Sequence, residues 1–364
     1  MADIPKDMRA ARLVEFNKPY ELQMIPTPRE LGKHDLLVKV AVASLCHTDS
    51  MVQAGYALSQ VPLVASHEGT GTVVALGSEV KDFTVGDRVL CSLVYGACGE
   101  CADCSAPEGY RQYCSQKAFL GVTQDGFFAE YARIDARESC RLPDRLSFIS
   151  AAPLACAGIT VWRGVVQARL REGQWLAIMG AGGGLGHLGI QFAKARGLSV
   201  VAIDARDKGL ELCRSAGADL VVDARSGLDK VVQEVHEATK GAGGVDATVN
   251  VTDAPNAAAM SCAVTRMHGR VIQIAQPDQV SVPFLEIIIR DIHIEGSLLA
   301  SQGQAQDMLQ TVVDHRISVH TNPFVGLEKV PKLLELAHSG EMKGKAVVVV
   351  DEESVEKEEG KDLI

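Results

Sequence analysis

Two patterns of hydrophobic and polar positions divide the chain. Up to about residue 156, short runs rich in Val and Leu are bounded by Gly, Pro and Asp, as in LLVKVAVASL (36–45) and DRVLCSLV (87–94). This pattern predicts short strands joined by turns. From residue 157 onward, continuous apolar runs alternate with segments that are apolar at helical spacing, which predicts buried parallel strands alternating with helices. We therefore expect a strand-rich region followed by a doubly wound α/β region.

The α/β region begins with a run that is typical of a strand buried on both faces, QWLAIMG (174–180). GHLGIQFAKARG (186–197) then predicts a helix and SVVAID (199–204) the next strand. DKGLELCRSAG (207–217) predicts a second helix, and AAAMSCAVTRMHG (257–269) continues the alternation as a later helix.

The pattern becomes helical again after about residue 300. QAQDMLQTVVDHR (304–316) and VPKLLELAHSG (330–340) predict helices, and KAVVVV (345–350) predicts a final strand. The charged tail EESVEKEEGKDLI (352–364) offers few apolar positions for packing, so we expect it to fray at the surface.

Composition limits the class of protein. The 364 residues include 36 Lys and Arg against 46 Asp and Glu, a net charge of −10, and the length suggests two or three domains. An acidic chain without a basic block is a poor nucleic-acid binder. No apolar run reaches the ~18 residues of a membrane helix, and the first residues lack the apolar segment of a secretory signal. We expect a cytoplasmic protein without nucleic-acid or membrane partners.

A glycine-rich motif, GAGGGLG, separates the first buried strand from the first helix. Gly180, Gly182 and Gly186 would let the backbone approach a pyrophosphate at the helix N-terminus. Asp204 ends the second strand, where a carboxylate accepts hydrogen bonds from the adenosine ribose and repels a 2′-phosphate. The motif predicts dinucleotide binding with NAD preferred over NADP. Arg206 would weaken that preference, and the alternative is that Asp204 only caps a helix.

Four of the ten cysteines fall on one loop: Cys98, Cys101, Cys104 and Cys114. Four thiolates suit a closed tetrahedral zinc site, which is structural rather than catalytic. An iron–sulfur cluster also takes four thiolates, and four unrelated buried cysteines are the third possibility.

A second set of metal-ligating side chains is dispersed: Cys46, His67 and Cys156. A catalytic zinc needs three protein ligands and an open position. Singly, each has an ordinary interpretation as a core histidine or a small buried thiol. Spacing alone does not bring the three together.

Taken together, the motifs resemble the zinc-dependent medium-chain alcohol dehydrogenases, specifically the yeast and fungal type. The resemblance covers nearly the whole chain and rests on CHTD (46–49), HEGTG (67–71), GDRV (86–89), the cysteine loop, LACAGITVW (154–162), GAGGGLG (180–186) and VVAIDARD (200–207). It implies a GroES-like, β-rich catalytic domain of residues 1–156 and 300–364, with a doubly wound Rossmann domain of residues 157–299 inserted. It also implies two zinc ions per chain, NAD, a small-molecule substrate that is an alcohol, aldehyde or ketone, and a homo-tetramer.

The resemblance assigns roles at the dispersed site. It implies that Cys46, His67 and Cys156 hold the catalytic zinc. Glu68 matches a carboxylate that can swing onto the zinc, and Asp49 matches the group that orients the ligand histidine. The four-cysteine loop matches the family's structural zinc site.

Further positions match the proton route and the cofactor contacts of that family. Thr48 matches the hydroxyl that takes the alcohol proton, but Met51 stands where many members have a histidine that continues the relay, and Met cannot carry a proton. The positions that match cofactor contacts are His47, Thr160, Gly180, Gly182, Gly183, Gly184, Leu185, Gly186, Asp204, Lys208, Val251 and Lys345.

The substrate pocket departs from the yeast-type pattern. Ala57 and Leu93 align with bulky tryptophans, and their smaller side chains predict a roomier pocket that prefers bulky or aromatic substrates. The alternative is that neighbouring aromatic side chains refill the space.

Three other functions compete with alcohol oxidation. A zinc-free quinone or enoyl reductase of the same superfamily would lack the dispersed ligands. A non-catalytic dinucleotide-binding protein with a vestigial site is the second, because fold alone does not establish activity. A polyol dehydrogenase usually has a carboxylate where this chain has Cys156.

Overall fold

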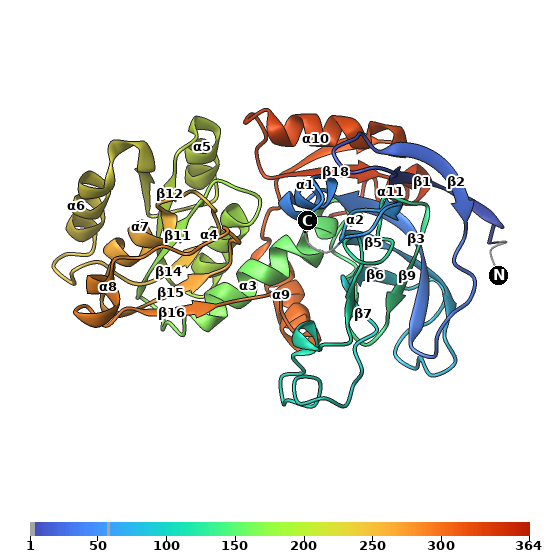
Figure 1. Ribbon diagram of the computed structural model, residues 1–364, viewed down its shortest axis with the longest axis horizontal. Coiled ribbons are helices and arrows are strands. Elements are labelled where there is room, and N and C mark those ends of the chain that lie inside the picture. Colours follow the sequence, from blue (N-terminus) through green and yellow to red (C-terminus); the bar gives the residue numbers. More distant parts are fainter. Residues whose placement is uncertain (1–3, 57–58) are drawn as a thin grey trace. The chain divides into compact units, whose positions relative to one another are not determined.

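The computed structural model describes residues 4–56 and 59–364, and the chain forms two compact units. One unit contains the described residues up to Ala157 together with Ala300–Ile364, so it is built from both ends of the chain (Figure 1). The other unit is Gly158–Leu299.

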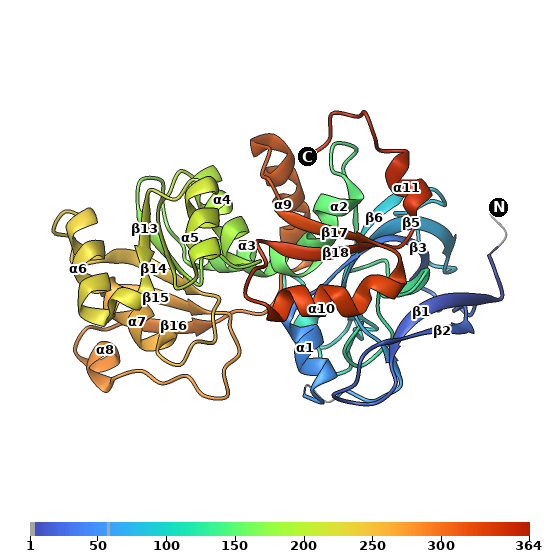
Figure 2. The same cartoon turned by 90° about the horizontal axis from the view of Figure 1, so that it is seen from above.

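The first unit is dominated by a mixed sheet with the strand order β10-β6-β5-β3-β18-β17, in which β9 also pairs with β3. Smaller sheets are β2-β1-β4 and β7-β8. The strands are β1 (Asp7–Leu13), β2 (Glu21–Pro26), β3 (Asp35–Ser44), β4 (Leu63–Val64), β5 (Glu68–Leu76), β6 (Arg88–Cys91), β7 (Val94–Tyr95), β8 (Ala118–Phe119), β9 (Tyr131–Asp135), β10 (Cys140–Arg141), β17 (Thr321–Val325) and β18 (Lys345–Val349). The pairing of β3 with β18 joins two segments about 300 residues apart (Figure 2).

Short helices surround this sheet. They are α1 (His47–Gln53), α2 (Phe148–Ala151), α9 (Gln302–His315), α10 (Val330–His338), α11 (Glu352–Glu356) and the 3₁₀ helices η1 (Arg111–Tyr113), η2 (Ala152–Ala155) and η4 (Leu327–Lys329). Ser301 caps the N-terminus of helix α9. Its side chain accepts a hydrogen bond from the backbone N–H of Gln304, and the Gln304 side chain accepts the Ser301 backbone N–H, a capping box that fixes the helix start.

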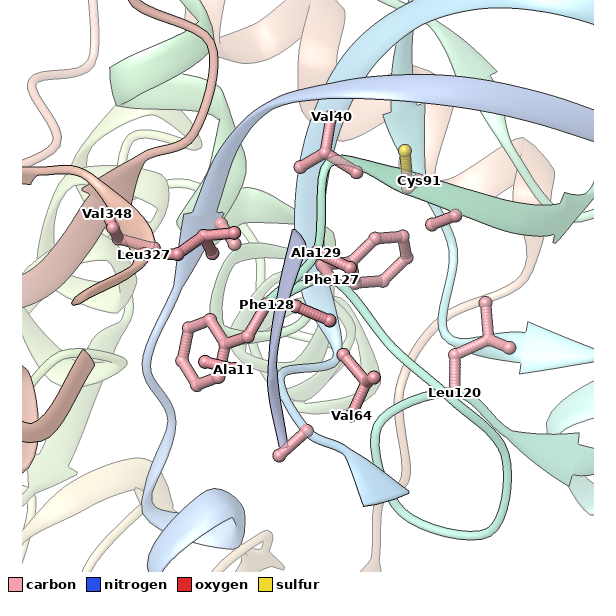
Figure 3. Packing of buried hydrophobic residues seen from close by; sticks show 14 of the residues in the cluster. Ala11, Val40, Val64, Cys91, Leu120, Phe127, Phe128, Ala129, Leu327 and Val348 are labelled. Atoms are coloured by element: carbon pink, nitrogen blue, oxygen red, sulfur yellow. The ribbon is translucent and has the colours of Figure 1, made fainter. Parts of the chain in front are cut away.

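The core of the first unit lies against strand β3, of which every residue but one is buried. Figure 3 shows Phe127 and Phe128 packed among aliphatic side chains that include Val40 and Val64. A Cβ at Gly69 would lie 2.5 Å from the Phe127 ring, so glycine is needed there for the ring to pack on β5. This core fixes the strand ends that carry the dispersed ligands.

The C-terminal tail is ordered, and the expectation that it would fray is wrong. Glu358 is buried, and its carboxylate pairs with Arg88 and accepts the backbone N–H of Phe148 at 3.0 Å. Backbone hydrogen bonds also join Ile364 to Ser147 and Arg145. Buried polar anchors, which composition does not reveal, hold the tail in place.

The second unit is a six-stranded parallel sheet with the order β13-β12-β11-β14-β15-β16, the arrangement of a doubly wound dinucleotide-binding fold. Its strands are β11 (Trp175–Met179), β12 (Ser199–Asp204), β13 (Leu220–Asp223), β14 (Val245–Asn250), β15 (Thr265–Gln273) and β16 (His293–Gly296). Its helices are α3 (Ala157–Gln167), α4 (Gly186–Ala195), α5 (Asp207–Ser215), α6 (Leu228–Ala238), α7 (Ala257–Val264), α8 (Phe284–Ile288) and the 3₁₀ helix η3 (Ala224–Ser226).

Alternate side chains of the central strands pack on opposite faces of this sheet. Ala177 and Ile203 point toward α6 and α7, where Val231 and Val264 complete a buried cluster. On the other face, Ile178 packs toward α4. Burial on both faces explains why these strands are continuous apolar runs in the sequence.

Within residues 4–56 and 59–364, no single helix is long and apolar enough to cross a membrane. One bent pair, Phe148–Ala155 with Ala157–Gln167, meets the criterion by length and composition only.

Candidate functional site

Neighbouring strand ends bring the dispersed residues together. Cys46 follows β3, and His67 precedes β5, which pairs with β3 so that Ser44 lies opposite Glu68. On the other side of β3, Val347 of β18 lies opposite Ser44, and this register places Lys345 beside Cys46. Three strands that are distant in sequence therefore end at one point.

Four ligand atoms meet at these strand ends. One each from Cys46, His67, Glu68 and Cys156 all lie within 4.8 Å of one another. Cys156 reaches the group from the end of η2, whose residues are buried against β5. Two thiols, an imidazole and a carboxylate in one buried cluster form a donor set that fits a single zinc ion.

Asp49 organises the cluster although it is not one of the four. It is fully buried, and its carboxylate accepts the backbone N–H groups of Cys46 at 2.8 Å and of Ser66 at 3.1 Å. Its Oδ1 also lies 3.4 Å from Nδ1 of His67. A carboxylate on one ring nitrogen fixes the imidazole orientation and leaves the other nitrogen for a metal.

Lys345 takes part in this cluster. The ammonium lies 2.6 Å from a carboxylate oxygen of Glu68, and both side chains are almost completely buried. The same carboxylate accepts the backbone N–H of Ala157 at 3.1 Å. The family resemblance matches Lys345 to a residue that contacts the cofactor pyrophosphate, and that role stays a prediction. In this structure the Lys345 ammonium is paired with Glu68 instead. Sequence spacing contains no signal for this pairing.

Hydrogen bonds, burial and neighbouring charges within the cluster shift the pKa values of its side chains. A hydrogen bond from the Cys156 thiol holds the pKa of Cys46 well below its usual range, against the effect of burial, and the same contact raises the pKa of Cys156. Burial raises the pKa of Glu68 to about 7, although Lys345 opposes the shift. One thiol is thus prepared to lose its proton first, as a metal ligand must.

Thr48 and His47 occupy the first turn of α1. The Thr48 hydroxyl oxygen lies 4.0 Å from Sγ of Cys46, and Thr48 is half-buried whereas His47 is exposed. Met51 lies on the same helix, one turn after His47. The roles of Thr48 and His47 stay predictions.

The cysteine loop brings its four thiols together. One ligand atom each from Cys98, Cys101, Cys104 and Cys114 lies within 4.8 Å of the others, and Sγ of Cys98 is 3.8 Å from Cys104 and 3.6 Å from Cys114. Thiolates at about 2.3 Å from one tetrahedral zinc are about 3.8 Å apart. These separations favour a single ion over an iron–sulfur cluster, because a cluster of several irons must fit between its thiolates.

Backbone N–H groups of the same loop stabilise the thiolate form of Cys114, whereas burial raises the pKa of Cys104 to about 12. Although loss of hydration opposes the shift, N–H donors of Cys98 and Gln116, each 3.4 Å from Sγ, lower the pKa of Cys114 to about 6. Such donors favour the charged form that a metal requires.

Two ion pairs, each between a buried carboxylate and a partly exposed arginine, fasten this loop, and the sequence does not reveal them. Asp135 and Arg137 are paired at 2.6 Å, and Arg137 also donates to the backbone carbonyl of Ala97 at 2.9 Å. Arg111 pairs with Glu138 at 2.8 Å. The two pairs hold both ends of the loop against the end of β9.

The glycine turn and Asp204 of the second unit are in direct contact. The Asp204 carboxylate accepts the backbone N–H of Gly182 at 2.8 Å and that of Arg206 at 3.0 Å. A Cβ on Gly182 would lie 2.2 Å from the backbone of Gly209, so only glycine permits this approach. The buried carboxylate therefore fixes the turn; its contact with a ribose stays a prediction.

The other positions matched to cofactor contacts are distributed over this unit. Gly183, Gly184 and Leu185 lie in the turn, and Gly186 begins α4. Thr160 is buried on α3, Lys208 is half-buried on α5, and Val251 follows β14 with its N–H donated to the carbonyl of Met179 at 3.0 Å.

Comparison with known proteins decides the family. Residues 32–144 match the alcohol dehydrogenase GroES-like domain, and residues 184–314 match the zinc-binding dehydrogenase family. An alcohol dehydrogenase of Geobacillus stearothermophilus is 34% identical over 94% of this chain and 100% of its own length. The chain belongs to the zinc-dependent medium-chain alcohol dehydrogenases.

Solved structures of the family share its fold. An alcohol dehydrogenase of Aeropyrum pernix superposes with a TM-score of 0.85 at 31% identity, over 94% of this chain and 99% of that chain. A structure described as an NAD-dependent alcohol dehydrogenase gives a TM-score of 0.86 at 28% identity, over 94% and 100%. The predicted fold class, a GroES-like domain with an inserted Rossmann domain, is confirmed. Membership of the yeast and fungal type stays a prediction.

Only one of the two residues on which the prediction of a roomier substrate pocket rests lies in the described part of the chain. Leu93 is buried, and its carbonyl accepts the backbone N–H of Leu120 at 2.9 Å. Ala57 lies outside the described residues.

Proposed function

We propose that this alcohol dehydrogenase homologue is a zinc- and NAD(H)-dependent oxidoreductase that interconverts alcohols with aldehydes or ketones. The observation that carries the proposal is the convergence of Cys46, His67, Glu68 and Cys156 within 4.8 Å at the ends of β3 and β5. The relatives and solved structures that are alcohol dehydrogenases support this reaction class.

Each side chain of the cluster has a separate task. Zinc, when bound, supplies Lewis acidity toward the substrate oxygen. Cys46, His67 and Cys156 would hold it, and Asp49 orients His67 through the 3.4 Å contact. Lys345 holds Glu68 close to the other three residues, so its carboxylate would be available as a further metal ligand.

The proton of the alcohol would pass to the Thr48 hydroxyl, which lies 4.0 Å from Sγ of Cys46. Met51 cannot continue a relay, so the proton leaves through solvent or through the exposed His47.

The cofactor would bind to the glycine turn of the second unit. Asp204 presents a carboxylate at the end of β12 that would repel a 2′-phosphate, which favours NAD. The structural neighbour described as NAD-dependent supports this choice. The Arg206 guanidinium lies 3.6 Å from the same carboxylate, and its positive charge would weaken the preference for NAD over NADP.

The substrate would be bulky or aromatic, because Leu93 is small compared with the tryptophan expected there. The first experiment measures NADH oxidation with acetaldehyde and with benzaldehyde side by side, before and after treatment with a zinc chelator, and repeats it with NADPH. Chelator-sensitive turnover that favours benzaldehyde and NADH is expected.

Other outcomes separate the alternatives. A preference for acetaldehyde removes the pocket argument and keeps the mechanism. Turnover that survives complete removal of zinc favours a zinc-free reductase, and no turnover with any aldehyde or ketone favours a vestigial site.

Self-association is part of the proposal, as a homo-tetramer of a cytoplasmic enzyme. Helix α8 leaves an apolar surface uncovered in the single chain: Phe284, Ile288 and Ile289 are each more than 60% exposed. Contiguous apolar surface of this kind is uncommon on monomers. The variant Ile288→Asp should dissociate the assembly in light scattering, whereas Lys332→Asp, at another exposed position, should not; a wild-type monomer would contradict the proposal.

A further inference from the structure

The C-terminal segment touches the dispersed metal site at its beginning, and its end reaches the segment that carries Cys156. Lys345, at the start of β18, pairs with Glu68. The chain then passes through α11 and returns to residues 145–148, immediately before and at the start of the helices that end at Cys156.

Glu358 makes the central contact of this return. One carboxylate oxygen pairs with Arg88 of β6, and the other accepts the N–H of Phe148 at 3.0 Å. The carboxylate is only 9% exposed. Arg88 also donates to the carbonyl of Pro143 at 3.3 Å, and its guanidinium lies 4.5 Å above the Phe148 ring.

A second contact lies six residues further along. The carbonyl of Ile364 accepts the backbone N–H of Ser147 at 3.2 Å and its hydroxyl at 3.0 Å, and the N–H of Ile364 donates to the carbonyl of Arg145 at 2.9 Å. Asp362 lies 3.0 Å from Arg316, which fastens the tail between the two contacts.

The held segment is continuous with the metal ligand. Phe148 begins α2, which runs into η2, and η2 ends at Cys156. All of residues 151–155 are buried, and those other than Pro153 are 1% exposed or less. The carbonyl of Phe148 accepts the hydroxyl of Thr70, on β5 two residues after Glu68, at 3.0 Å. A closely packed helical stretch transmits a displacement of one end to the other.

We propose that residues 358–364 act as a strap that positions Cys156, with Glu358 as its positioning residue, so that the tail sets how firmly the dispersed site retains its metal. The inference rests on the proposed function, because it assigns Cys156 to the metal. Without the Glu358 carboxylate, the Phe148 N–H loses its acceptor, and Arg88 loses its charged partner while keeping its hydrogen bonds to the carbonyls of Pro143 and Leu146, so the segment before Cys156 loosens.

The test compares Glu358→Gln with Glu359→Gln, a matched change at the exposed neighbouring residue. In the zinc-loaded enzyme, transfer of zinc to a chromogenic chelator is followed together with hydrogen–deuterium exchange of peptides that cover 148–156 and 96–114. We expect Glu358→Gln to release the dispersed-site zinc about tenfold faster and to exchange faster in 148–156 only, with the four-cysteine site unchanged. Glu358→Asp, which keeps the charge, should restore part of the retention.

Equal acceleration at both metal sites would show general destabilisation and overturn the proposal, as would an unchanged exchange rate in 148–156 or an unchanged zinc release. Failure of the proposed function looks different. The wild-type protein would then hold no zinc at Cys156, and the exchange measurement alone would decide whether the strap holds the segment.

Discussion

The two cysteine-containing clusters are built in opposite ways. All ligands of the four-cysteine loop lie within residues 98–114. The ligands Cys46, His67 and Cys156 of the dispersed cluster come from three separate segments, and a fourth segment supplies Lys345, which pairs with Glu68. The loop relies on nearby N–H donors and two ion pairs, and the dispersed cluster relies on the register of β3, β5 and β18. A site whose ligands all lie on one short loop can be recognised from their spacing in the sequence. A site whose ligands are brought together by strand pairing can be recognised only once the fold is known.

The largest expected effect comes from removing one dispersed ligand. Cys46→Ser should lower kcat at least about 10³-fold, because several kcal/mol of charge stabilisation depend on the metal held there. Metal analysis should show the loss of one zinc per chain with the four-cysteine zinc retained. Cys213→Ala, which removes a buried thiol outside both clusters, is the control. Loss of both ions in Cys46→Ser would show that the two sites are not independent.

Removing one ligand of the four-cysteine loop should lower the stability of the protein more than its kcat. Cys104→Ser should lower the free energy of unfolding by about 4 kcal/mol, a size typical of losing a structural metal. Urea unfolding measures the loss, and limited proteolysis should cut within residues 96–114. A fall in kcat as large as that of Cys46→Ser would contradict the assignment of the loop as structural.

Breaking the buried Lys345–Glu68 pair measures how much the register of β3, β5 and β18, which brings the two residues together, contributes to stability. Lys345→Met leaves Glu68 without its partner, so stability should fall by about 3 kcal/mol. The loss should grow as pH rises, because the pKa of Glu68, already raised to about 7, rises further and its folded form resists ionisation. Unfolding measured at pH 6 and pH 9 checks this; the double variant with Glu68→Gln should recover most of the loss, and Lys332→Met, at an exposed position, should show none.

The smallest effect concerns an ion pair that fastens the cysteine loop. Burial raises the pKa of Glu138 to about 7, although Arg111 lies 2.8 Å away. A carboxyl group with a raised folded-state pKa stabilises the protein below its unfolded pKa, and this contribution is lost as pH rises through about 7. Glu138→Gln should therefore gain about 1–2 kcal/mol relative to wild type between pH 5 and pH 8, measured by urea unfolding. An unchanged difference over this range would show that Arg111 keeps the carboxylate ionised.

The sequence predicts the elements of the second unit well, because strands buried on both faces must be apolar throughout; SVVAID coincides with β12. One helix was predicted too long. AAAMSCAVTRMHG stops being helical at Val264, since Thr265 pairs with Val245 at the start of β15 and its hydroxyl contacts Thr248 at 2.7 Å. Partners across a sheet are absent from a local pattern.

The four-cysteine cluster could be predicted from spacing, and the dispersed one only through resemblance to a family. The Lys345–Glu68 pair, the Asp135–Arg137 pair and the anchored tail were not predicted at all. The partners of Lys345 and of the tail carboxylate Glu358 are set by strand register and by the return of the chain, which have no sequence signature. Asp135 and Arg137 are only two residues apart, but nothing in the local sequence shows that the Asp135 carboxylate is buried.

Strand β18 has a consequence for the order in which the protein is made. The residues that complete the dispersed cluster follow the whole inserted unit, Gly158–Leu299, so a ribosome finishes that unit before Lys345 exists. At 5–20 residues per second, roughly 10–40 seconds pass between the synthesis of Cys156 and that of β18. During this interval all four candidate ligands of the dispersed cluster exist, but Glu68 lacks the Lys345 ammonium, and residues 42–44 of β3 lack their β18 partner. The buried Lys345–Glu68 ion pair is therefore the last part of the dispersed cluster to form, after both sets of candidate metal ligands have been synthesised.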